Sequence, residues 1–479
     1  MSISRFHVKI VGFIIIALLV ARYVIPTQLL GDSADDLLGG CLGLQGKVIY
    51  VDFFSHHGPL IYYINSLIFT LLGSCPLYVP QYIFYGIFLG LLFLVFHYTK
   101  STPVVFFLLI SYGLVARQYA LNTALAETWL SVVAIATFLL LFFHQKMHQG
   151  VCWPLFTLVQ LSFILANPLY AFGSIFLLLY FLITSHYGKI QLILASLIPS
   201  FLFFLHFGWT NYWENIIVFN VQYYQQYSGS LLDFYRRYWA FIKTGAHTIA
   251  KGPAFWFDQQ TDVTLFELFA GAMWFGIQLQ KFNDNKKKIL VVFTVLLASI
   301  FAIRPEGTRL APFLFFILPG IAYSYLLRRS VRHTVFLAVL IVLMFRLFIG
   351  TVAPDRDSDA PVYMEIINEY SKTNDTILIF PGRTDFYLTT GRRPGSYYNF
   401  FVPWMADQPG AESRLIDDIQ RNEVQLILID DTKNIYGRGT PSQYMKNVIE
   451  FLKKSTAYVR RGVNPSLIIY TRITNTQDL

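Results

Sequence analysis

Long apolar stretches recur along the first 350 residues of this 479-residue chain, and they constrain the fold more than any other feature. Hydrophobic residues make up 55% of the sequence and charged residues only 14%, a balance that excludes a soluble globular protein. A helix needs about 20 consecutive apolar residues to cross a bilayer. The sequence therefore predicts a polytopic α-helical membrane protein.

The apolar stretches predict about eleven spans, with one further segment, 59–73, as a membrane-surface or re-entrant helix. The predicted spans lie at 8–25, 78–98, 102–116, 124–143, 152–166, 169–185, 189–206, 263–280, 288–303, 310–327 and 333–350. If 59–73 also spanned, the later loops would change sides, and the Lys-rich run at 286–288 would lie outside the cell.

Basic residues fix the predicted orientation, because Lys and Arg favour cytoplasmic loops. The amino terminus, with Arg5 and Lys9, is placed in the cytoplasm, and no small-residue cleavage site follows it, so we expect an uncleaved first span. The remaining cytoplasmic ends carry Lys100, Lys146, Lys189, Lys281, Lys286–Lys288, Arg328, Arg329 and Arg332. The net charge of +9 is thus an orientation signal, and no nucleic-acid partner is predicted.

The composition changes near Thr351, which divides the chain into a predicted transmembrane region, 1–350, and a soluble region, 351–479. The soluble region is predicted to be an extracytoplasmic α/β domain. Its predicted strands are 376–380, 424–429 and 467–470, and its predicted helices are 362–370, 412–421 and 444–452. Asp430 and Asp431 follow a strand, where a capping or turn role is favoured over a site.

A polar stretch, residues 31–63, follows the first span within the predicted extracytoplasmic loop 26–77. Charges cost several kcal/mol in hydrocarbon, so acids at a membrane surface beside an apolar bundle suggest chemistry on a substrate that lies partly in lipid. The stretch carries Asp32, Asp35, Asp36, Asp52, His56 and His57. The predicted topology brings Arg117, Glu127, Arg304, Glu306 and Arg309 to the same side.

The three cysteines, Cys41, Cys75 and Cys152, are scattered and form no CxxC motif, so we expect no role for them. The chain also lacks metal-ligand spacing of the zinc type. Its carboxylates leave a divalent metal open, but no metal or other cofactor is predicted.

The motifs of the first loop resemble those of the polyprenyl-phosphate-dependent glycosyltransferases of the GT-C superfamily. This group contains the bacterial aminoarabinose transferase of lipid A and the protein O-mannosyltransferases. The matching residues are Asp32, Gly46, Tyr50-Val51-Asp52, His57-Gly58-Pro59-Leu60, Tyr62 and Tyr63. The chain departs from the family at Asp32-Ser33, where relatives commonly have Asp-Glu, and at His57, where they have lysine.

The resemblance implies an inverting transfer of a sugar from a polyprenyl-phosphate donor to a lipid, glycan or protein of the cell envelope. It also implies a bacterial inner (plasma) membrane location. We predict Asp32 as the general base, because its spacing to Gly46 fits the family, with Asp36 one helical turn on. The choice between these two acids and Asp35 stays open.

The chemistry of the donor indicates the same region. Its isoprenoid tail stays in the bilayer, and a carboxylate at the surface must take the proton of the attacking hydroxyl. The leaving phosphate develops charge that cationic or hydrogen-bonding groups must stabilise. The predicted substrate-binding residues are His56, His57, Arg117, Glu127, Arg304 and Arg309.

The predicted site residues also have possible structural roles, and the chain has two alternative functions. Asp32 could cap a helix, the histidines could pack at the interface, and Arg304 and Arg309 could pair with Glu306. A transporter or lipid flippase predicts internal repeats and broken helices near mid-membrane, and no clear repeat is found. A non-catalytic envelope assembly protein would tolerate loss of Asp32.

Overall fold

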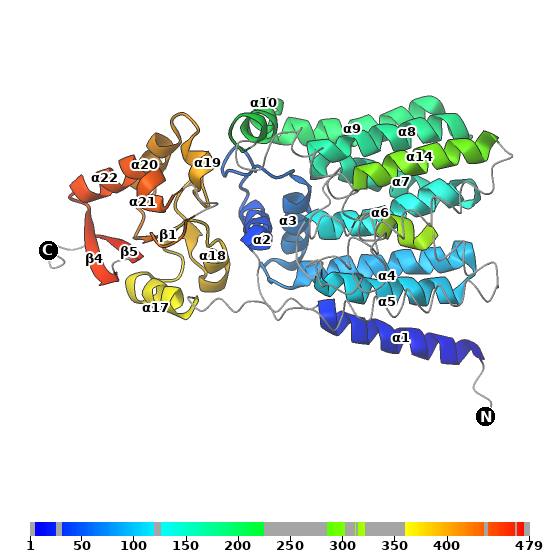
Figure 1. Cartoon of the computed structure of the whole chain (residues 1–479), viewed down its shortest axis with the longest axis horizontal. Helices are drawn as coiled ribbons and strands as arrows, with labels where there is room; N and C mark the ends of the chain where they lie inside the picture. The colour runs from blue at the N-terminus through cyan, green and yellow to red at the C-terminus, as the bar shows by residue number, and fades with distance from the viewer. Residues whose placement is uncertain are drawn as a thin grey trace, which may run out of the picture.

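The computed structural model describes residues 5–24, 31–118, 126–224, 285–301, 312, 315–320, 360–434, 439–464 and 467–473. Within these ranges a bundle of long helices forms one end of the molecule, and an α/β region forms the other (Figure 1). Two shorter helices, α2 (Gly31–Leu44) and α3 (Leu60–Leu72), lie between them.

The bundle helices coincide with eight of the predicted apolar stretches. They are α1 (Arg5–Val24), α4 (Val79–Thr99), α5 (Thr102–Gln118), α6 (Ala126–Phe143), α7 (Gln149–Ala166), α8 (Ala171–Thr184), α9 (Lys189–Phe207) and α14 (Asn285–Phe301). Four segments of the described chain are long and apolar enough to cross a membrane: 79–99, 128–146, 149–166 and 189–207. The predicted spans 263–280 and 333–350 lie outside the described residues, and 310–327 is described only in part. The chain is thus a helical membrane protein, and the number of its spans stays a prediction.

The bundle helices differ in how much of their surface other helices cover. In the apolar window of α6, 89% of the residues are buried, whereas in that of α9 only 22% are. Both windows are strongly apolar, so the exposed face of α9 is suited to lipid rather than water. The helix α6 is therefore central, and α9 lies at the rim.

The segment predicted as a surface or re-entrant helix forms α3. Its 13 residues extend about 20 Å, less than the roughly 30 Å of a hydrocarbon core. Pro59 precedes its first turn, and Gly73, at a φ of 65°, ends it in the left-handed conformation that glycine adopts readily. Its length agrees with the prediction that it does not span.

Helices α2 and α3 pack closely because glycines of α2 face α3. A Cβ at Gly40 would lie 2.5 Å from the Cβ of Asn65, and one at Gly43 would lie 2.5 Å from Ser66 Oγ. Such distances exclude any larger residue without a shift of α3. We refer to α2, α3 and the turn between them, residues 31–72, as the α2–α3 hairpin.

A disulfide closes the hairpin. Cys41 of α2 bonds to Cys75, which follows α3, with 5.7 Å between their Cα atoms. The expectation that these two cysteines have no role was therefore wrong. They are 34 residues apart, and only the packing of α2 on α3 brings them together. Cys152 is a buried free thiol.

The α/β region contains one five-stranded sheet with the order β2-β1-β3-β5-β4. Strands β2 (Arg393–Pro394), β1 (Thr376–Phe380) and β3 (Leu426–Asp430) are parallel, and β5 (Leu467–Arg472) and β4 (Tyr458–Asn464) join antiparallel. The predicted strands coincide with β1, β3 and β5, whose burial explains their continuous apolar sequence. The helices are α17 (Ala360–Tyr370), α18 (Asp385–Thr390), α19 (Pro403–Ala406), α20 (Ala411–Arg421), α21 (Pro441–Tyr444) and α22 (Lys446–Lys454).

A helical segment after α9 packs against both the bundle and the α/β region. It consists of α10 (Trp209–Tyr212), η3 (Trp213–Val218) and η4 (Asn220–Tyr224). Phe219 from this segment and Phe54 from the α2–α3 turn belong to the hydrophobic core of the α/β region. Helix α18 also packs against α2, and α19 against η4. The α/β region is therefore docked on the hairpin.

Candidate active site

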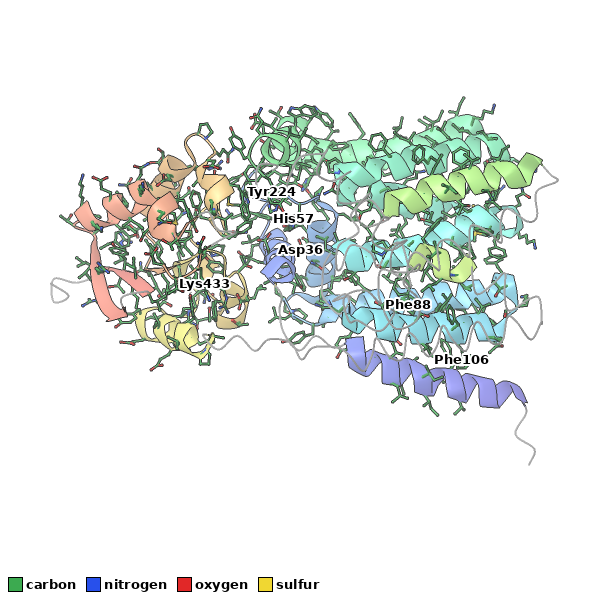
Figure 2. The ribbon with its side chains drawn as sticks, viewed as in Figure 1. Asp36, His57, Phe88, Phe106, Tyr224 and Lys433 are labelled. Carbon is green, nitrogen blue, oxygen red and sulfur yellow. A yellow bond between two sulfur atoms is a disulfide. The ribbon has the colours of Figure 1, made fainter. Side chains whose placement is uncertain are left out.

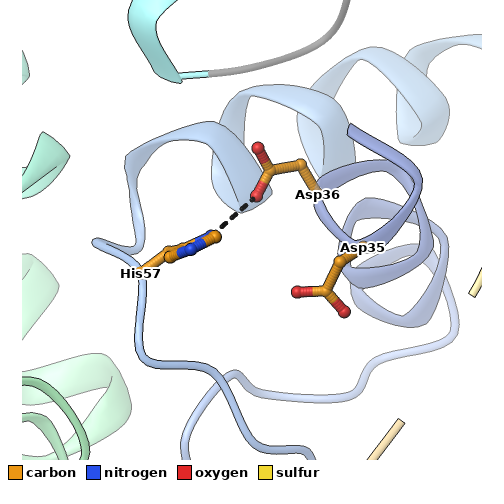
Figure 3. Close-up of side chains that lie close together, drawn as sticks. All are labelled: Asp35, Asp36 and His57. Carbon is orange, nitrogen blue, oxygen red and sulfur yellow. Dashed lines mark ion pairs between the residues drawn. The ribbon is translucent and has the colours of Figure 1, made fainter. Parts of the chain in front are cut away.

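Three polar side chains of the hairpin lie close together. Two of them, Asp36 and His57, are seen in Figure 2 where the bundle meets the α/β region. Asp35 and Asp36, from the first half of α2, are 5% and 1% exposed. His57, from the turn before α3, has a partly exposed side chain. One carboxylate oxygen of each aspartate and one ring nitrogen of His57 lie within 4.8 Å of one another (Figure 3). We refer to these three residues as the acidic cluster.

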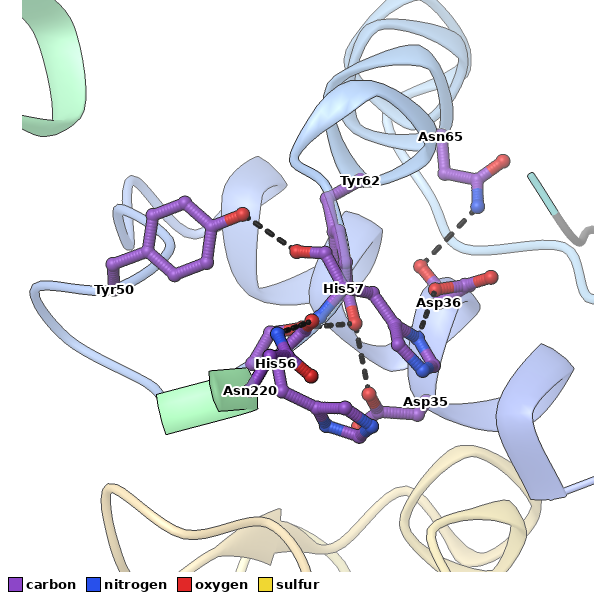
Figure 4. A network of polar contacts seen from close by, with 9 residues as sticks. Asp35, Asp36, Tyr50, His56, His57, Tyr62, Asn65 and Asn220 are labelled. Carbon is purple, nitrogen blue, oxygen red and sulfur yellow. Dashed lines mark hydrogen bonds and ion pairs between the residues drawn. The ribbon is translucent and has the colours of Figure 1, made fainter. Parts of the chain in front are cut away.

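Asp35 is held by a chain of hydroxyl groups (Figure 4). The Tyr62 hydroxyl donates to Asp35 Oδ2 at 2.8 Å and lies 2.8 Å from Ser55 Oγ. Ser55 Oγ in turn accepts from the amide of His57 at 3.0 Å. Burial, with the nearby carboxylates of Asp35 and Asp36, raises the pKa of Tyr62 well above its usual value. Tyr62 therefore stays protonated and remains a donor to Asp35.

Asp36 faces the imidazole of His57. Asp36 Oδ1 lies 3.8 Å from His57 Nδ1, close enough for an ion pair when the imidazole is protonated but longer than a hydrogen bond. Asn65 of α3 donates to the backbone carbonyl of Asp36 at 3.2 Å, and the Tyr50 hydroxyl donates to the carbonyl of His57 at 2.6 Å. The backbone on both sides of this pair is thus fixed by side chains of the hairpin.

His56 has different surroundings from those of its neighbour. Its ring lies among aromatic rings, 5.2 Å from that of Tyr224 and 4.3 Å from that of His57 between centroids. Asn220 donates to its backbone carbonyl at 3.0 Å. The structure therefore places His56 beside the acidic cluster, at the contact with the segment after α9.

The α/β region contacts the turn that carries His57. The amide of Phe54 donates to the carbonyl of Tyr397 at 2.7 Å. The Tyr397 hydroxyl lies 3.1 Å from both the Tyr50 carbonyl and Asn215 Oδ1, and it can donate to one of them at a time. The guanidinium of Arg414 lies 3.4 Å from the centre of the Tyr397 ring. Sequence reasoning missed Tyr397, because 347 residues separate it from Tyr50.

The acidic cluster has the ligand types that bind a divalent cation. Carboxylate oxygens suit Mg²⁺ and Mn²⁺, and an imidazole nitrogen adds affinity for Mn²⁺ or Zn²⁺. Ligand atoms about 2.1 Å from one ion lie at most about 4.2 Å apart, so small side-chain movements suffice to close the cluster on an ion. The sequence showed no metal motif, because His57 is 21 residues from Asp36 and reaches it only through the fold. The cluster can accept a proton, bind a cation, or do both.

The other predicted site residues are not all described. Asp32 lies in the first turn of α2, four residues before Asp36, but its side chain is outside the described part of the chain. The same holds for the side chains of Arg117 in α5 and Glu127 in α6. Arg304 and Arg309 lie outside the described residues. The structure brings Asp36 and His57 together with Asp35, and the other assignments stay predictions.

Three further aspartates have structural roles. Asp52 accepts from the amide of Val48 at 2.7 Å and so closes the turn. Asp430 accepts from the amide of Thr432 at 3.0 Å, and Asp431 from that of Ser442 at 2.7 Å. The capping or turn role favoured for Asp430 and Asp431 is confirmed.

Comparisons with known proteins identify similar solved structures only. No family model matches the sequence, and no curated protein shows significant sequence similarity. Two of the similar solved structures are archaeal oligosaccharyltransferases, which have the GT-C fold. One is the Archaeoglobus fulgidus oligosaccharyltransferase tethered by a disulfide bond to an acceptor peptide with the NVT sequon, with 12% identity and a TM-score of 0.47. The other is AglB of the same organism in complex with an inhibitory peptide and a dolichol-phosphate, with 13% identity and a TM-score of 0.44.

Each match covers 99% of this chain and 75% of the other. With TM-scores below 0.5, these likenesses carry no argument about activity.

Proposed function

We propose that this chain is an integral membrane glycosyltransferase that takes its sugar from a polyprenyl-phosphate carrier and transfers it to a lipid, glycan or protein of the cell envelope. The observation that carries the proposal is the acidic cluster, two buried carboxylates and an imidazole at the end of an apolar helix bundle. A lipid-linked sugar with its tail in the bilayer presents its anomeric carbon at such a level. Buried charges at a membrane surface are costly and therefore indicate function.

The proposed reaction is a single displacement. A carboxylate takes the proton of the acceptor hydroxyl as its oxygen bonds to the anomeric carbon. The bond from that carbon to the phosphate oxygen breaks, the polyprenyl phosphate leaves, and the anomeric configuration inverts. Asp32 is the proposed base, with Asp36 four residues later in α2 as its partner or alternative.

The leaving phosphate needs groups that stabilise its charge. His57 is the described candidate, and Arg117, Arg304 and Arg309 are proposed to assist it. Glu127 is proposed to contact the substrate or orient Arg117, and His56 to line the site. A divalent cation held by Asp35, Asp36 and His57 would supply positive charge for the same purpose.

The acidic cluster is proposed to face the extracytoplasmic side of a bacterial plasma membrane, as is the α/β region, residues 351–479. The Cys41–Cys75 disulfide supports this orientation, because disulfides persist in oxidising compartments outside the cytoplasm. The distribution of Lys and Arg around the apolar stretches supports it independently.

The test is transfer activity in membrane vesicles from source cells that lack the gene and carry each variant at equal protein level. The vesicles receive radiolabelled polyprenyl-phosphate sugars, and label in the acceptor fraction is counted. Asp32→Asn and Asp36→Asn are expected to lower transfer by roughly 100-fold or more. Asp417→Asn, an exposed carboxylate on α20, is the matched control and should transfer at the wild-type rate.

Wild-type transfer by both Asp32→Asn and Asp36→Asn would rule out these two acids as the base and leave Asp35. Transfer that is equal in vesicles with and without the gene would rule out the enzyme proposal. Labelled carrier that crosses the membrane without transfer of its sugar would support the lipid flippase instead.

A further inference from the structure

A cavity of about 130 Å³ lies between α2, the turn at 46–53, α3 and the end of α9. Its wall includes the small residues Gly39 and Gly43, together with the ring of Tyr63. Tyr62 also lines it, and the same Tyr62 donates to Asp35. The cavity therefore adjoins the acidic cluster without containing Asp35, Asp36 or His57.

Side chains that can donate hydrogen bonds line the cavity. They are the ammonium of Lys47, the imidazole of His206, and the hydroxyls of Ser66, Tyr62 and Tyr63. The Tyr63 hydroxyl is buried and has no hydrogen-bond partner in the described part of the chain. None of the lining residues is acidic, and Asp52, on the same turn, already accepts from the Val48 amide. This donor set is suited to an anion.

The lipid-facing helix leads to this cavity. Helix α9 exposes a continuous apolar face and ends next to His206. The exposed residues are Ile190, Ile193, Leu194, Leu197, Ile198, Phe201, Leu202 and Leu205. Trp209 and Trp213, both exposed, follow directly, and exposed tryptophans of this kind mark the level of lipid headgroups. The cavity thus opens near the depth at which lipid phosphates lie.

We propose that this cavity binds the phosphate of a membrane lipid whose hydrocarbon chain lies along the exposed face of α9. Lys47 supplies a charge, and His206, Ser66 and Tyr63 donate hydrogen bonds to the phosphate oxygens. This site goes beyond the proposed transfer reaction and does not require it. A phosphate held here would lie beside Tyr62, which donates to Asp35, but outside the acidic cluster.

The experiment measures lipid binding to the full-length protein by native mass spectrometry from detergent. Phosphatidylglycerol and undecaprenyl phosphate are the two phosphate-bearing probes, and an uncharged diacylglycerol and inorganic phosphate are the comparison probes. Lys47→Gln is expected to weaken binding roughly fivefold, the effect of one lost cation near a membrane surface, and Lys47→Gln with His206→Gln by roughly tenfold or more. Lys189→Gln, an exposed lysine at the other end of α9, should bind like wild type.

The two lipid probes distinguish the sources of the phosphate. If the Lys47→Gln variants bind both lipids less tightly than wild type, the cavity is a general site for lipid phosphates. If they bind only undecaprenyl phosphate less tightly, the cavity is a site for the lipid carrier. The proposal is overturned if the double variant binds both lipids like wild type, if Lys189→Gln weakens binding equally, or if diacylglycerol or inorganic phosphate binds as tightly as the lipids. No sugar donor is present, so failure here leaves the transferase proposal intact, and loss of transfer in Asp36→Asn leaves this proposal intact.

Discussion

Buried carboxylates occur both in the α2–α3 hairpin and in the α/β region, and each accepts from a tyrosine hydroxyl distant in the sequence, but Asp430 also has donors within its own turn. Asp430, 5% exposed, accepts from the amide and hydroxyl of Thr432 within its own turn and from the hydroxyl of Tyr363. Asp35, equally buried, stands beside a second carboxylate, Asp36, and their described side-chain partners come from beyond α2.

These surroundings indicate a structural role for Asp430 and a candidate catalytic role for Asp35 and Asp36. Asp430 ends β3, where its carboxylate accepts from the Thr432 amide and lies 3.9 Å from the Lys433 ammonium, so its charge has a cation and hydrogen-bond donors around it. Two adjacent carboxylates repel each other when both are ionised, and burial increases that cost. Such a pair contributes little to folding, so its position beside an imidazole is better explained by a substrate or a cation.

The largest effect is expected from exchanging one carboxylate for an amide in each region. Asp36→Asn should lower transfer by about 10² to 10⁴-fold while the protein keeps its thermal stability. Asp430→Asn should do the reverse: transfer per folded molecule is kept, while the α/β region loses about 1–3 kcal/mol, because an amide cannot accept all the bonds of the carboxylate. Transfer assays, together with hydrogen exchange of β1, β3 and β5, separate the two outcomes.

Equal loss of transfer in both variants, with equal loss of protection in the sheet, would mean that the two acids have the same structural role. The contrast between the regions would then be wrong.

The second effect concerns the disulfide, which lies in the hairpin only. Reduction of Cys41–Cys75 removes the closure of a 34-residue loop, which stabilises a folded chain by roughly 2–4 kcal/mol. Reductant should therefore increase hydrogen exchange in α2 and α3 and leave the sheet unchanged, since the α/β region contains no cysteine. The variant with Cys41→Ser and Cys75→Ser is the control and should not respond to reductant. A wild-type hairpin that exchanges equally slowly with and without reductant would show that packing alone holds it.

The local hydropathy of the sequence predicted the helices and strands, whereas the acidic cluster depends on contacts between residues that are distant in the sequence. Hydropathy predicted α4 to α9 and the strands β1, β3 and β5, because burial in lipid or in a sheet imposes a composition on each segment by itself. The acidic cluster needs His57 to return to α2 across the turn, and its support needs Tyr62, 27 residues from Asp35. The hydrophobic periodicity of a segment contains no information on contacts between residues so far apart in the sequence.

The resemblance at the first loop singled out two of the three residues that the fold brings together. It pointed to Asp36 and His57, and it left Asp35 as an open alternative for the base. The disulfide was missed because cysteine spacing has meaning only in known motifs. Gly40 and Gly43 allow α3 to approach α2, and only that approach puts Cys41 near Cys75.

The smallest effect tests whether the two regions are coupled through Tyr397. Its hydroxyl lies against the Tyr50 carbonyl, and the Tyr50 hydroxyl holds the carbonyl of His57. Tyr397→Phe removes one hydrogen bond of about 1 kcal/mol and should lower kcat by several-fold with little change in KM. The backbone bond from Phe54 to Tyr397 is kept, so the α/β region stays docked.

Tyr458→Phe is the matched control for this test. Tyr458 is 8% exposed, as is Tyr397, and its hydroxyl lies 3.0 Å from the Val424 carbonyl, within the α/β region. If the hydroxyl at either position has only a structural role, its removal should lower stability and leave kcat unchanged. Lower kcat in Tyr397→Phe alone, with faster hydrogen exchange at residues 50–58, would therefore make the α/β region part of the machinery that positions His57. Equal kcat in the two variants would leave it as a separate unit that rests on the hairpin without affecting the reaction.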